Sequence, residues 1–465
     1  MLFRRLSAIL IASSLLFAGF GCSNTSNPEL AAKSKPFTLK YWRVFDEDDA
    51  FNEIFAAYRA QHKNISVEYR KFRPEEYEKA LLNAFAEGTG PDVFSLHNTS
   101  LGGWDQRLTP APAVLTVPYS EMSTGLKKEV ITVLKKIPGM TPQRLAAEFV
   151  PAVAEDVVIP TEQADPQAPL VPRVYGLPLA VDTMVVYYNR DLLNAAGIAQ
   201  PAADWIEFRE QVKKITKLDE TGAIIQSGAA LGTSKNVERS TDLLGLLMMQ
   251  NGAHMTENGV AAFERRPPEL PQRTLPPGAE ALVFYTDFAN PEKEGYSWND
   301  KMPNSLEAFL NGSTAYFFGY AYHLPTIRTR APRLNFGIAP MPQVDINNAK
   351  NFANYWVETV SKQTAHPEEA WDFVQFVTGA NQAKNYLKRT KKPTALLSLV
   401  SEQANDLDLA TFAAALPTAK NWYHGGDASA TEKAFAEMID AMLAAEADPK
   451  RIVEIGVTKV NQTMR

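Results

Sequence analysis

In the first hundred residues the apolar positions alternate between the spacing of a β-strand and that of an α-helix. This alternation predicts strands that are each followed by a helix. Residues 37–44 are strand-like, whereas apolar side chains in 46–61 recur at helical spacing after an acidic first turn. A second strand at 65–69, a helix beginning at Pro74 and a third strand in PDVFSL continue the pattern. This βαβαβ order predicts a parallel sheet in an α/β fold.

The loops after the first and third predicted strands are candidate site walls. Ligands of open parallel sheets bind beyond the carboxyl ends of the strands, which here points to residues 45–48 and 95–100. Asp46 begins the acidic run Asp46-Glu47-Asp48-Asp49. The run is best suited to start the following helix, since a helix start favours negative charge, and one of its carboxylates is also placed to face a ligand.

The pattern becomes irregular and proline-rich from residue 101 to 171, which predicts surface connections and short helices. Strands are predicted again at 175–181 and 184–188. Asp182 lies between these two apolar runs, where one strand system passes to the next.

Two helix starts follow the second of these strands. Asn189 is expected to cap a short helix that Gly197 ends, and Asp204 with Glu207 forms a capping-box pair for a longer one. A second α/β unit therefore begins near residue 184.

The N-terminus has the order of a secretory signal peptide over residues 1–21: a basic start, a short apolar core and small residues. Cys22 is the only cysteine, so no intrachain disulfide or thiolate metal cluster can form. Its position resembles the lipobox of bacterial lipoproteins, although Gly19 replaces the usual Leu. Cys22 is thus predicted to carry lipid and residues 22–35 to form a flexible tether; an incidental cysteine in a discarded leader is the alternative.

Composition and motifs narrow the function classes. With 465 residues, 45% of them hydrophobic, the chain can form large cores, and its net charge of −6 without basic clusters argues against nucleic-acid binding. The sequence has no P-loop, GxSxG or HExxH motif, and its histidines never pair at metal-ligand spacing within a helix, so we expect no catalytic residue, metal or cofactor. Tyr187 and Tyr188 could suggest a ferric-iron site, but successive strand residues point to opposite faces.

Several segments together resemble the extracellular solute-binding proteins of ABC importers, especially the maltose-binding type. No single segment is diagnostic, but their order along most of the chain is specific: LKYWRVFDEDDAFNEIFAAYRAQHKNISVEYR, EGTGPDVFSL, VYGLPLAVDTMVVYYNRDLLNAAGI, SLEAFLNGSTAYFFGY and HPEEAWDFVQFVTGANQAKNYL.

The resemblance implies two α/β lobes, three chain crossings between them and a ligand held in the cleft. On this template lobe one comprises residues 36–181 and 345–395, and lobe two comprises 183–344 and 396–465. Asp182 would lie on the first crossing and accept hydrogen bonds from ligand hydroxyls. The alternative is a structural carboxylate that caps backbone donors at the crossing.

Aromatic side chains are further candidates, because sugar rings pack their C–H groups on aromatic faces. Most aromatic residues belong to cores, and only Tyr320 and Trp356 gain from their template positions. The candidate ligand contacts besides Asp182 and Asp46 are Trp42, Asn98, Trp104, Tyr320, Trp356 and Trp422.

The implied function is a solute-binding subunit outside the cytoplasm, anchored by lipid to a bacterial membrane. It would capture a small solute, most simply a sugar or oligosaccharide, by hinge closure, and deliver it as a monomer to an ABC permease. An exported glycoside hydrolase, or a receptor that reports ligand to a sensor kinase, remains open from sequence.

Overall fold

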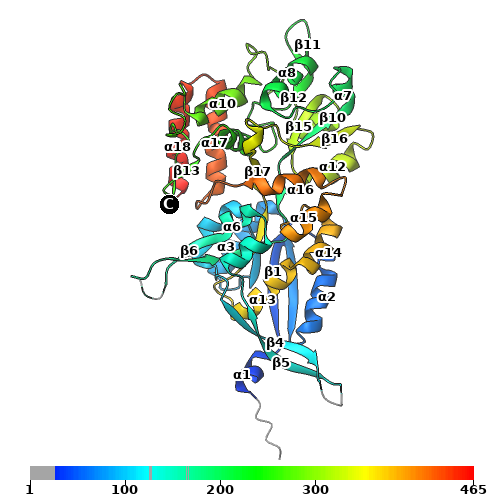
Figure 1. Cartoon of the computed structure of the whole chain (residues 1–465), viewed down its shortest axis with the longest axis vertical. Coiled ribbons are helices and arrows are strands. Elements are labelled where there is room, and N and C mark those ends of the chain that lie inside the picture. The colour runs from blue at the N-terminus through cyan, green and yellow to red at the C-terminus, as the bar shows by residue number, and fades with distance from the viewer. Residues whose placement is uncertain (1–26, 125–127, 164, 166, 465) are drawn as a thin grey trace, which may run out of the picture.

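The computed structural model describes residues 27–124, 128–163, 165 and 167–464, which form two α/β lobes one above the other (Figure 1). The leader and Cys22 lie outside the described residues, so both stay predictions. Part of the expected flexible tether is instead a helix, α1 (Pro28–Lys33). Lys33 holds it to the body of lobe one by donating to the carbonyl of Thr116 at 2.7 Å, and Asn64 donates to the Lys33 carbonyl at 2.9 Å.

Lobe one is built on a five-stranded sheet in the order β2-β1-β3-β18-β8. Strands β2, β1 and β3 are parallel, as the βαβαβ pattern predicts. Strand β18 pairs antiparallel with β3, and β8 pairs antiparallel with β18. Its elements are β1 (Phe37–Val44), α2 (Asn52–Gln61), β2 (Ile65–Phe72), α3 (Pro74–Ala86), β3 (Val93–His97), β8 (Gly176–Pro178), β18 (Trp356–Val360), α13 (Pro367–Thr378) and α14 (Ala380–Thr390).

Lobe two has its own sheet, in the order β11-β12-β15-β10-β16. Its strands are β10 (Val185–Asn189), β11 (Lys217–Leu218), β12 (Ile224–Ala229), β15 (Thr314–Gly319) and β16 (Phe336–Ala339). Its helices are α7 (Arg190–Ala195), α8 (Trp205–Ile215), α9 (Ser240–Gln250), α10 (Pro277–Asp287), α11 (Ser305–Leu310), α12 (His323–Arg330), α17 (Ala428–Leu443) and α18 (Pro449–Thr463).

Both predicted helix starts of lobe two are confirmed. The Asn189 side chain accepts from the backbone N–H groups of Asp191 and Leu192, and that of Asp204 accepts from Ile206 and Glu207. The capping-box pair is formed only in its Asp204 half, since the Glu207 carboxylate accepts from the Gln211 side-chain amide at 3.0 Å and not from the Asp204 N–H. Local capping chemistry therefore sets where these helices begin.

A three-stranded sheet, β19-β17-β9, joins the lobes. Each strand comes from a different part of the chain: β9 (Asp182–Thr183), β17 (Asn351–Asn354) and β19 (Ala419–Lys420). Near the third crossing Leu396 still belongs to the hydrophobic core of lobe one. The exact lobe boundaries therefore stay a prediction, whereas the two-lobe α/β fold with a hinge is what the structure shows.

The prediction of only irregular segments and short helices for residues 101–171 was wrong in two parts, an antiparallel ribbon and a short hairpin. Strands β4 (Val114–Met122) and β5 (Val130–Pro138) form an antiparallel ribbon. Its strand signal is weak because many of its side chains are exposed and Pro118 interrupts the pattern. The short helices α5 (Pro142–Glu148) and α6 (Pro151–Val157) do occur, followed by a hairpin of β6 (Val158–Thr161) and β7 (Val171–Val174).

No helix within the described ranges has both the length and the apolar character needed to cross a bilayer.

Candidate functional site

A pocket lies between the two lobes and takes its lining from both of them. Lobe one contributes His97 and Thr99 at the carboxyl end of β3, which is the loop that the strand order predicts. The hinge strand β17 contributes Asn354. Lobe two lines the pocket with residues of α9, α17 and the chain before each, including Arg239, Asp242, Trp422, Thr431 and Glu432.

The wall formed by lobe two carries charge. Arg239 forks onto Asp242 with Nε–O and Nη2–O distances of 2.8 and 2.7 Å, and its Nη2 also lies 2.9 Å from Glu432. Burial opposes the charged guanidinium, but the two carboxylates outweigh it and raise the pKa of Arg239. The side chains of Arg239 and Glu432 are 26% and 48% exposed, so this wall offers a fixed donor and acceptor to a ligand.

Tyr320 and Tyr322 extend this wall. The buried Tyr320 hydroxyl donates to Asp242 at 2.6 Å. The Tyr322 ring stacks on Tyr320 with centroids 5.6 Å apart and is 48% exposed. Tyr320 therefore orients the charged group, whereas Tyr322 presents an aromatic face.

Aromatic side chains of lobe one lie beside the pocket residue His97. The Trp356 ring lies 5.5 Å from His97 and 5.8 Å from Phe45, both edge-on. Burial lowers the pKa of His97, which keeps its ring neutral near pH 7. Phe45 is 55% exposed, and its φ of 74° is strained for a bulky side chain. The N–H of Asp46 donates to the carbonyl of Val44 at 3.0 Å, which closes a tight turn around Phe45.

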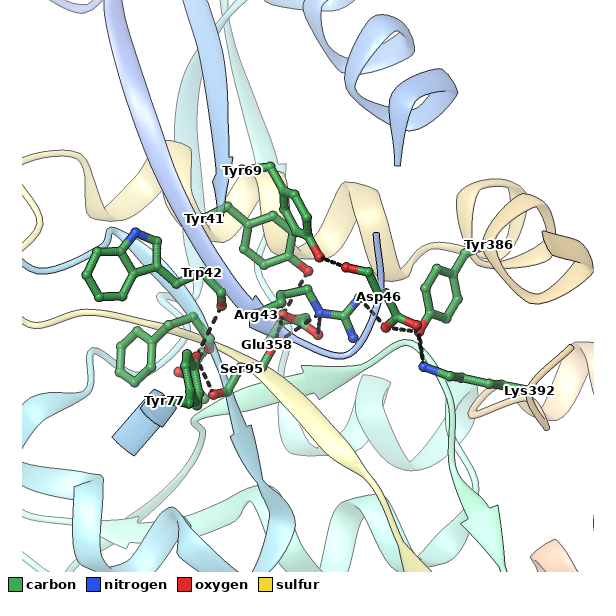
Figure 2. Close-up of polar contacts among 12 residues, drawn as sticks. Tyr41, Trp42, Arg43, Asp46, Tyr69, Tyr77, Ser95, Glu358, Tyr386 and Lys392 are labelled. Carbon is green, nitrogen blue, oxygen red and sulfur yellow. Dashed lines mark hydrogen bonds and ion pairs between the residues drawn. The ribbon is translucent and has the colours of Figure 1, made fainter. Parts of the chain in front are cut away.

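Asp46 anchors that turn from inside lobe one (Figure 2). Its carboxylate accepts from Lys392 at 2.6 Å and from the Tyr386 hydroxyl at 2.8 Å, and lies 3.3 Å from Arg43. Burial alone would raise the pKa of Asp46, but Arg43 and Lys392 outweigh it and lower the pKa. Its oxygens are thus occupied by protein partners, and its ligand contact stays a prediction.

Arg43 extends the cluster to Glu358 on β18. Its Nε lies 3.2 Å from Glu358 Oε1, while the hydroxyls of Tyr41 and Ser95 donate to Oε2 at 2.8 and 2.9 Å (Figure 2). Burial raises the pKa of Glu358 against the opposing attraction of Arg43. We call Arg43, Asp46, Glu358, Tyr386 and Lys392 the lobe-one charge cluster.

Asp182 lies on β9 and is partly exposed. Its Oδ1 accepts from the backbone N–H groups of Thr183 at 2.9 Å and Ala321 at 3.0 Å. Burial raises its pKa to about 7, although these backbone donors act in the opposite direction. The contacts match the alternative considered from sequence, a carboxylate that caps donors at the crossing, and its contact with ligand stays a prediction.

The other predicted contacts divide into two groups. Trp422 lines the pocket, and Trp356 packs on the lining residue His97 without being part of the lining itself. Trp42, Asn98 and Trp104 are buried inside lobe one and are absent from the described pocket lining. Trp42 packs on Phe72 with centroids 4.7 Å apart, Trp104 lies 5.8 Å from both Phe85 and Phe94, and Asn98 donates to Asp156 at 2.9 Å.

Phe45 and His97 lie in the two loops that the sequence marked as candidate site walls, although neither was singled out; sequence reasoning missed Arg239, Asp242, Tyr322 and Glu432. The third strand pointed to His97, and the segment GYAYH placed Tyr322 two residues beyond the recognised Tyr320. Glu432 carries no local signal, because only the fold brings α17 to α9.

The described residues contain no group of three or more His, Cys, Asp or Glu side chains placed to hold a metal ion. Tyr187 and Tyr188 have separate surroundings. The buried Tyr187 hydroxyl donates to the carbonyl of Tyr320 at 2.7 Å, whereas the half-buried Tyr188 ring lies 5.3 Å from the Arg190 guanidinium carbon.

Three proteins to which this chain is similar in sequence or fold are named as binding proteins. A putative binding protein of Brucella abortus is 23% identical over 261 residues, which cover 53% of this chain and 57% of that protein, so this chain spans little more than half the length of that relative. The maltodextrin-binding protein MdxE of Bacillus subtilis is 22% identical over 86% of this chain and 83% of its own. The sugar-binding protein MalE of Xanthomonas citri has the same fold, with a TM-score of 0.69, 18% identity, and coverage of 92% of this chain and 97% of its own.

The model of the family described as bacterial extracellular solute-binding protein matches residues 45–384, most of both lobes. The chain belongs to the bacterial extracellular solute-binding proteins.

Proposed function

We propose that this chain is the solute-binding subunit of an ABC importer and captures a carbohydrate between its lobes. The observation that carries the proposal is the pocket whose opposite walls differ in chemistry. Beside the pocket, the Trp356 ring packs on the lining residue His97 and on the exposed Phe45, while Arg239 and Glu432 of the lining present a hydrogen-bond donor and acceptor. A sugar needs both kinds of contact, since its C–H faces are apolar and its hydroxyls are polar.

Two relatives support a saccharide as ligand, since MdxE is named for maltodextrin and the Xanthomonas protein for sugar. Each of these side chains has a proposed contact with the sugar. Trp356, Phe45 and Tyr322 stack on sugar rings, and Arg239, Glu432 and Asp182 bond to hydroxyls. Ligand held by both walls favours the closed arrangement of the lobes, because only that arrangement forms all contacts.

The proposed location is the outer face of a bacterial membrane. The leader directs export, Cys22 carries lipid, and the monomer delivers its solute to membrane permease subunits. This part rests on the sequence of the leader and on the family. Intact mass of the chain extracted from membranes tests the anchor: an unmodified chain would contradict it.

Calorimetry with maltodextrins, galacto-oligosaccharides and monosaccharides tests the binding function. We expect one saccharide class to bind stoichiometrically and to reduce the radius of gyration in small-angle X-ray scattering. Reducing-end release is measured in the same samples. Turnover of the saccharide would favour the hydrolase, and absence of binding across the panel would contradict a carbohydrate ligand.

A pull-down of the ligand-loaded chain from native membranes tests the permease partner. Capture of a sensor kinase in place of permease subunits would contradict the transport function.

A further inference from the structure

The ribbon of β4 and β5 projects from lobe one at the end of the molecule where α1 lies (Figure 1). Its far end exposes three large apolar side chains: Met122 is 56%, Val130 61% and Ile131 41% exposed. Met122 pairs directly with Val130, so these two share one face of the ribbon, and Ile131 lies on the other. The face of Met122 and Val130 is therefore apolar at the tip, whereas on the other face Ile131 lies opposite the exposed Glu121, which pairs with Lys135.

The base of the ribbon is fixed to the lobe. Leu115 and Val117 are fully buried, and the Tyr119 hydroxyl donates to Asp372 at 2.6 Å. The Thr116 N–H donates to Glu368 at 3.2 Å, and the same carboxylate pairs with Lys33 of α1. The ribbon and α1 therefore form one structure, from which the apolar tip extends.

The length of chain before α1 limits how far this end of the protein can lie from a membrane anchor. Five residues, 23–27, separate Cys22 from Pro28, which gives a reach of about 20 Å when fully extended. Along β4, Met122 lies six residues beyond Thr116, the contact of Lys33, which is also about 20 Å at strand rise. The tip can thus reach the bilayer surface to which a lipid on Cys22 would attach the chain.

We propose that the tip of the β4–β5 ribbon, formed by Met122, Val130 and Ile131, inserts at the headgroup and acyl-chain boundary of the anchoring bilayer. The proposal rests on the proposed lipidation of Cys22. Three apolar side chains are too few for stable binding from solution, but a short tether raises their local concentration at the surface to about the millimolar range. The exposed Lys128, two residues from Val130, fits a lipid phosphate, and the exposed Glu129 lies between them.

The contact would hold lobe one against the membrane and leave lobe two, at the opposite end of the long axis in Figure 1, free to move. Lipid and ribbon together form a two-point attachment. Such an attachment restricts the orientations of the cleft relative to the membrane, which a single lipid on a flexible tether does not.

Spin labelling of the full lipidated chain in vesicles of phosphatidylethanolamine and phosphatidylglycerol tests the proposal. Cys22 is the only native cysteine and its thiol is occupied by lipid in this form, so an introduced cysteine is the one reactive thiol. Labels at Val130→Cys, Thr132→Cys and Lys136→Cys sample one face of β5 from the tip toward the base. We expect oxygen collisions to rise and nickel-chelate collisions to fall by at least about twofold at 130, less at 132 and least at 136.

The matched control is Ile206→Cys, whose native side chain is 75% exposed; it belongs to α8, which lies at the end of the molecule away from the ribbon (Figure 1). Its label should report water in every sample, and label 130 should report water when the chain is released by protease cleavage within the tether. A lipidated chain whose label 130 stays in water overturns the ribbon contact alone. A chain without lipid overturns the anchor and the contact together. A change in collision rates at label 130 that scales with the density of protein on the vesicles shows pairing of ribbons between copies, and it overturns the bilayer contact.

Discussion

The two walls of the cleft handle charge in opposite ways. In lobe one the Arg43–Glu358 pair is almost fully buried, with side chains 5% and 0% exposed, and the surface that reaches the cleft is aromatic. In lobe two the Arg239–Glu432 pair is partly in solvent, with side chains 26% and 48% exposed. Similar ion pairs therefore have different roles in the two lobes: Arg43–Glu358 stabilises the interior of lobe one, whereas Arg239–Glu432 remains available to a ligand.

The largest expected effect is loss of stability when the buried pair is broken. Glu358→Ala leaves Arg43 without its main partner inside lobe one, which typically costs about 3 to 5 kcal/mol in unfolding free energy. Urea unfolding of the ligand-free chain measures it. The matched control is Glu432→Ala, whose exposed ion pair should contribute only about 1 kcal/mol or less. Equal losses of unfolding free energy in the two variants would contradict the distinction between a buried and an exposed ion pair.

Asp182 comes next, because it lies on the hinge strand β9 and accepts from the backbone of β9 and of lobe two. Asp182→Ala removes the acceptor of two backbone N–H groups, which should cost about 1 to 3 kcal/mol. Asp182→Asn keeps an acceptor oxygen and should retain most of that stability. If the carboxylate also accepts ligand hydroxyls, both variants lose about tenfold or more in affinity by calorimetry; full affinity in the Asn variant would leave Asp182 a purely structural role.

The stability that Asp182 contributes should also depend on pH. The carboxyl pKa is raised to about 7 in the folded chain, from about 4 in an unfolded one. A raised pKa means that the folded state holds the proton longer, so the stability from the protonated form is present below about pH 4 and is lost as pH rises through 7. Asp182→Asn should flatten this part of the profile of melting temperature against pH.

The third effect concerns the aromatic wall, and here binding and stability should separate. Phe45→Gly removes a ring that contacts Trp356 but places glycine at a φ of 74°, which glycine adopts readily. We expect affinity for the identified saccharide to fall about tenfold, with unfolding free energy unchanged or higher by up to about 1 kcal/mol. Phe45→Ala is the control, since it loses the ring and keeps the strain. Unchanged affinity in both would remove Phe45 from the site.

The sequence predicted the parts of the fold that depend on local chemistry. The alternating periods in residues 37–96 identify the parallel strands of lobe one, and Asn189 and Asp204 cap the helices that their positions indicate. The ribbon of β4 and β5 was missed because a two-stranded arm with many exposed residues carries little apolar alternation.

The site was harder to predict, because its groups meet only in three dimensions. Arg239 and Glu432 are 193 positions apart. Trp42 and Trp104 have the residue type expected of a sugar site, but the side on which a strand or helix packs decides whether an aromatic ring is core or surface. The family resemblance placed Trp356 and Tyr320 near the cleft because it carries that three-dimensional information.

The smallest effect is expected where the two lobes touch beside the hinge. His424, in the segment between β19 and α17, lies 2.9 Å from Asp156 of α6, whose side chain is fully buried and also accepts from the hydroxyl of Tyr355 at 2.6 Å. Burial disfavours a charged His424, but Asp156, with Glu155 nearby, outweighs it and raises the pKa. This contact joins a buried carboxylate of lobe one to a partly exposed partner from lobe two.

The sign of its pH dependence follows from that raised pKa. The folded state binds the His424 proton more tightly than the unfolded state, so the stability is complete below about pH 6.5 and is lost as pH rises through the higher folded-state pKa. His424→Gln should therefore reduce the drop in melting temperature between pH 6 and pH 8.5, by about 1 to 2 °C because the ring is 44% exposed. His254→Gln is the matched control: its ring is 41% exposed but pairs with the surface carboxylates of Glu257 and Glu269. A larger change in the control would show that burial of the carboxylate partner does not decide the strength of these pairs, which is the principle that separates the two walls of the cleft.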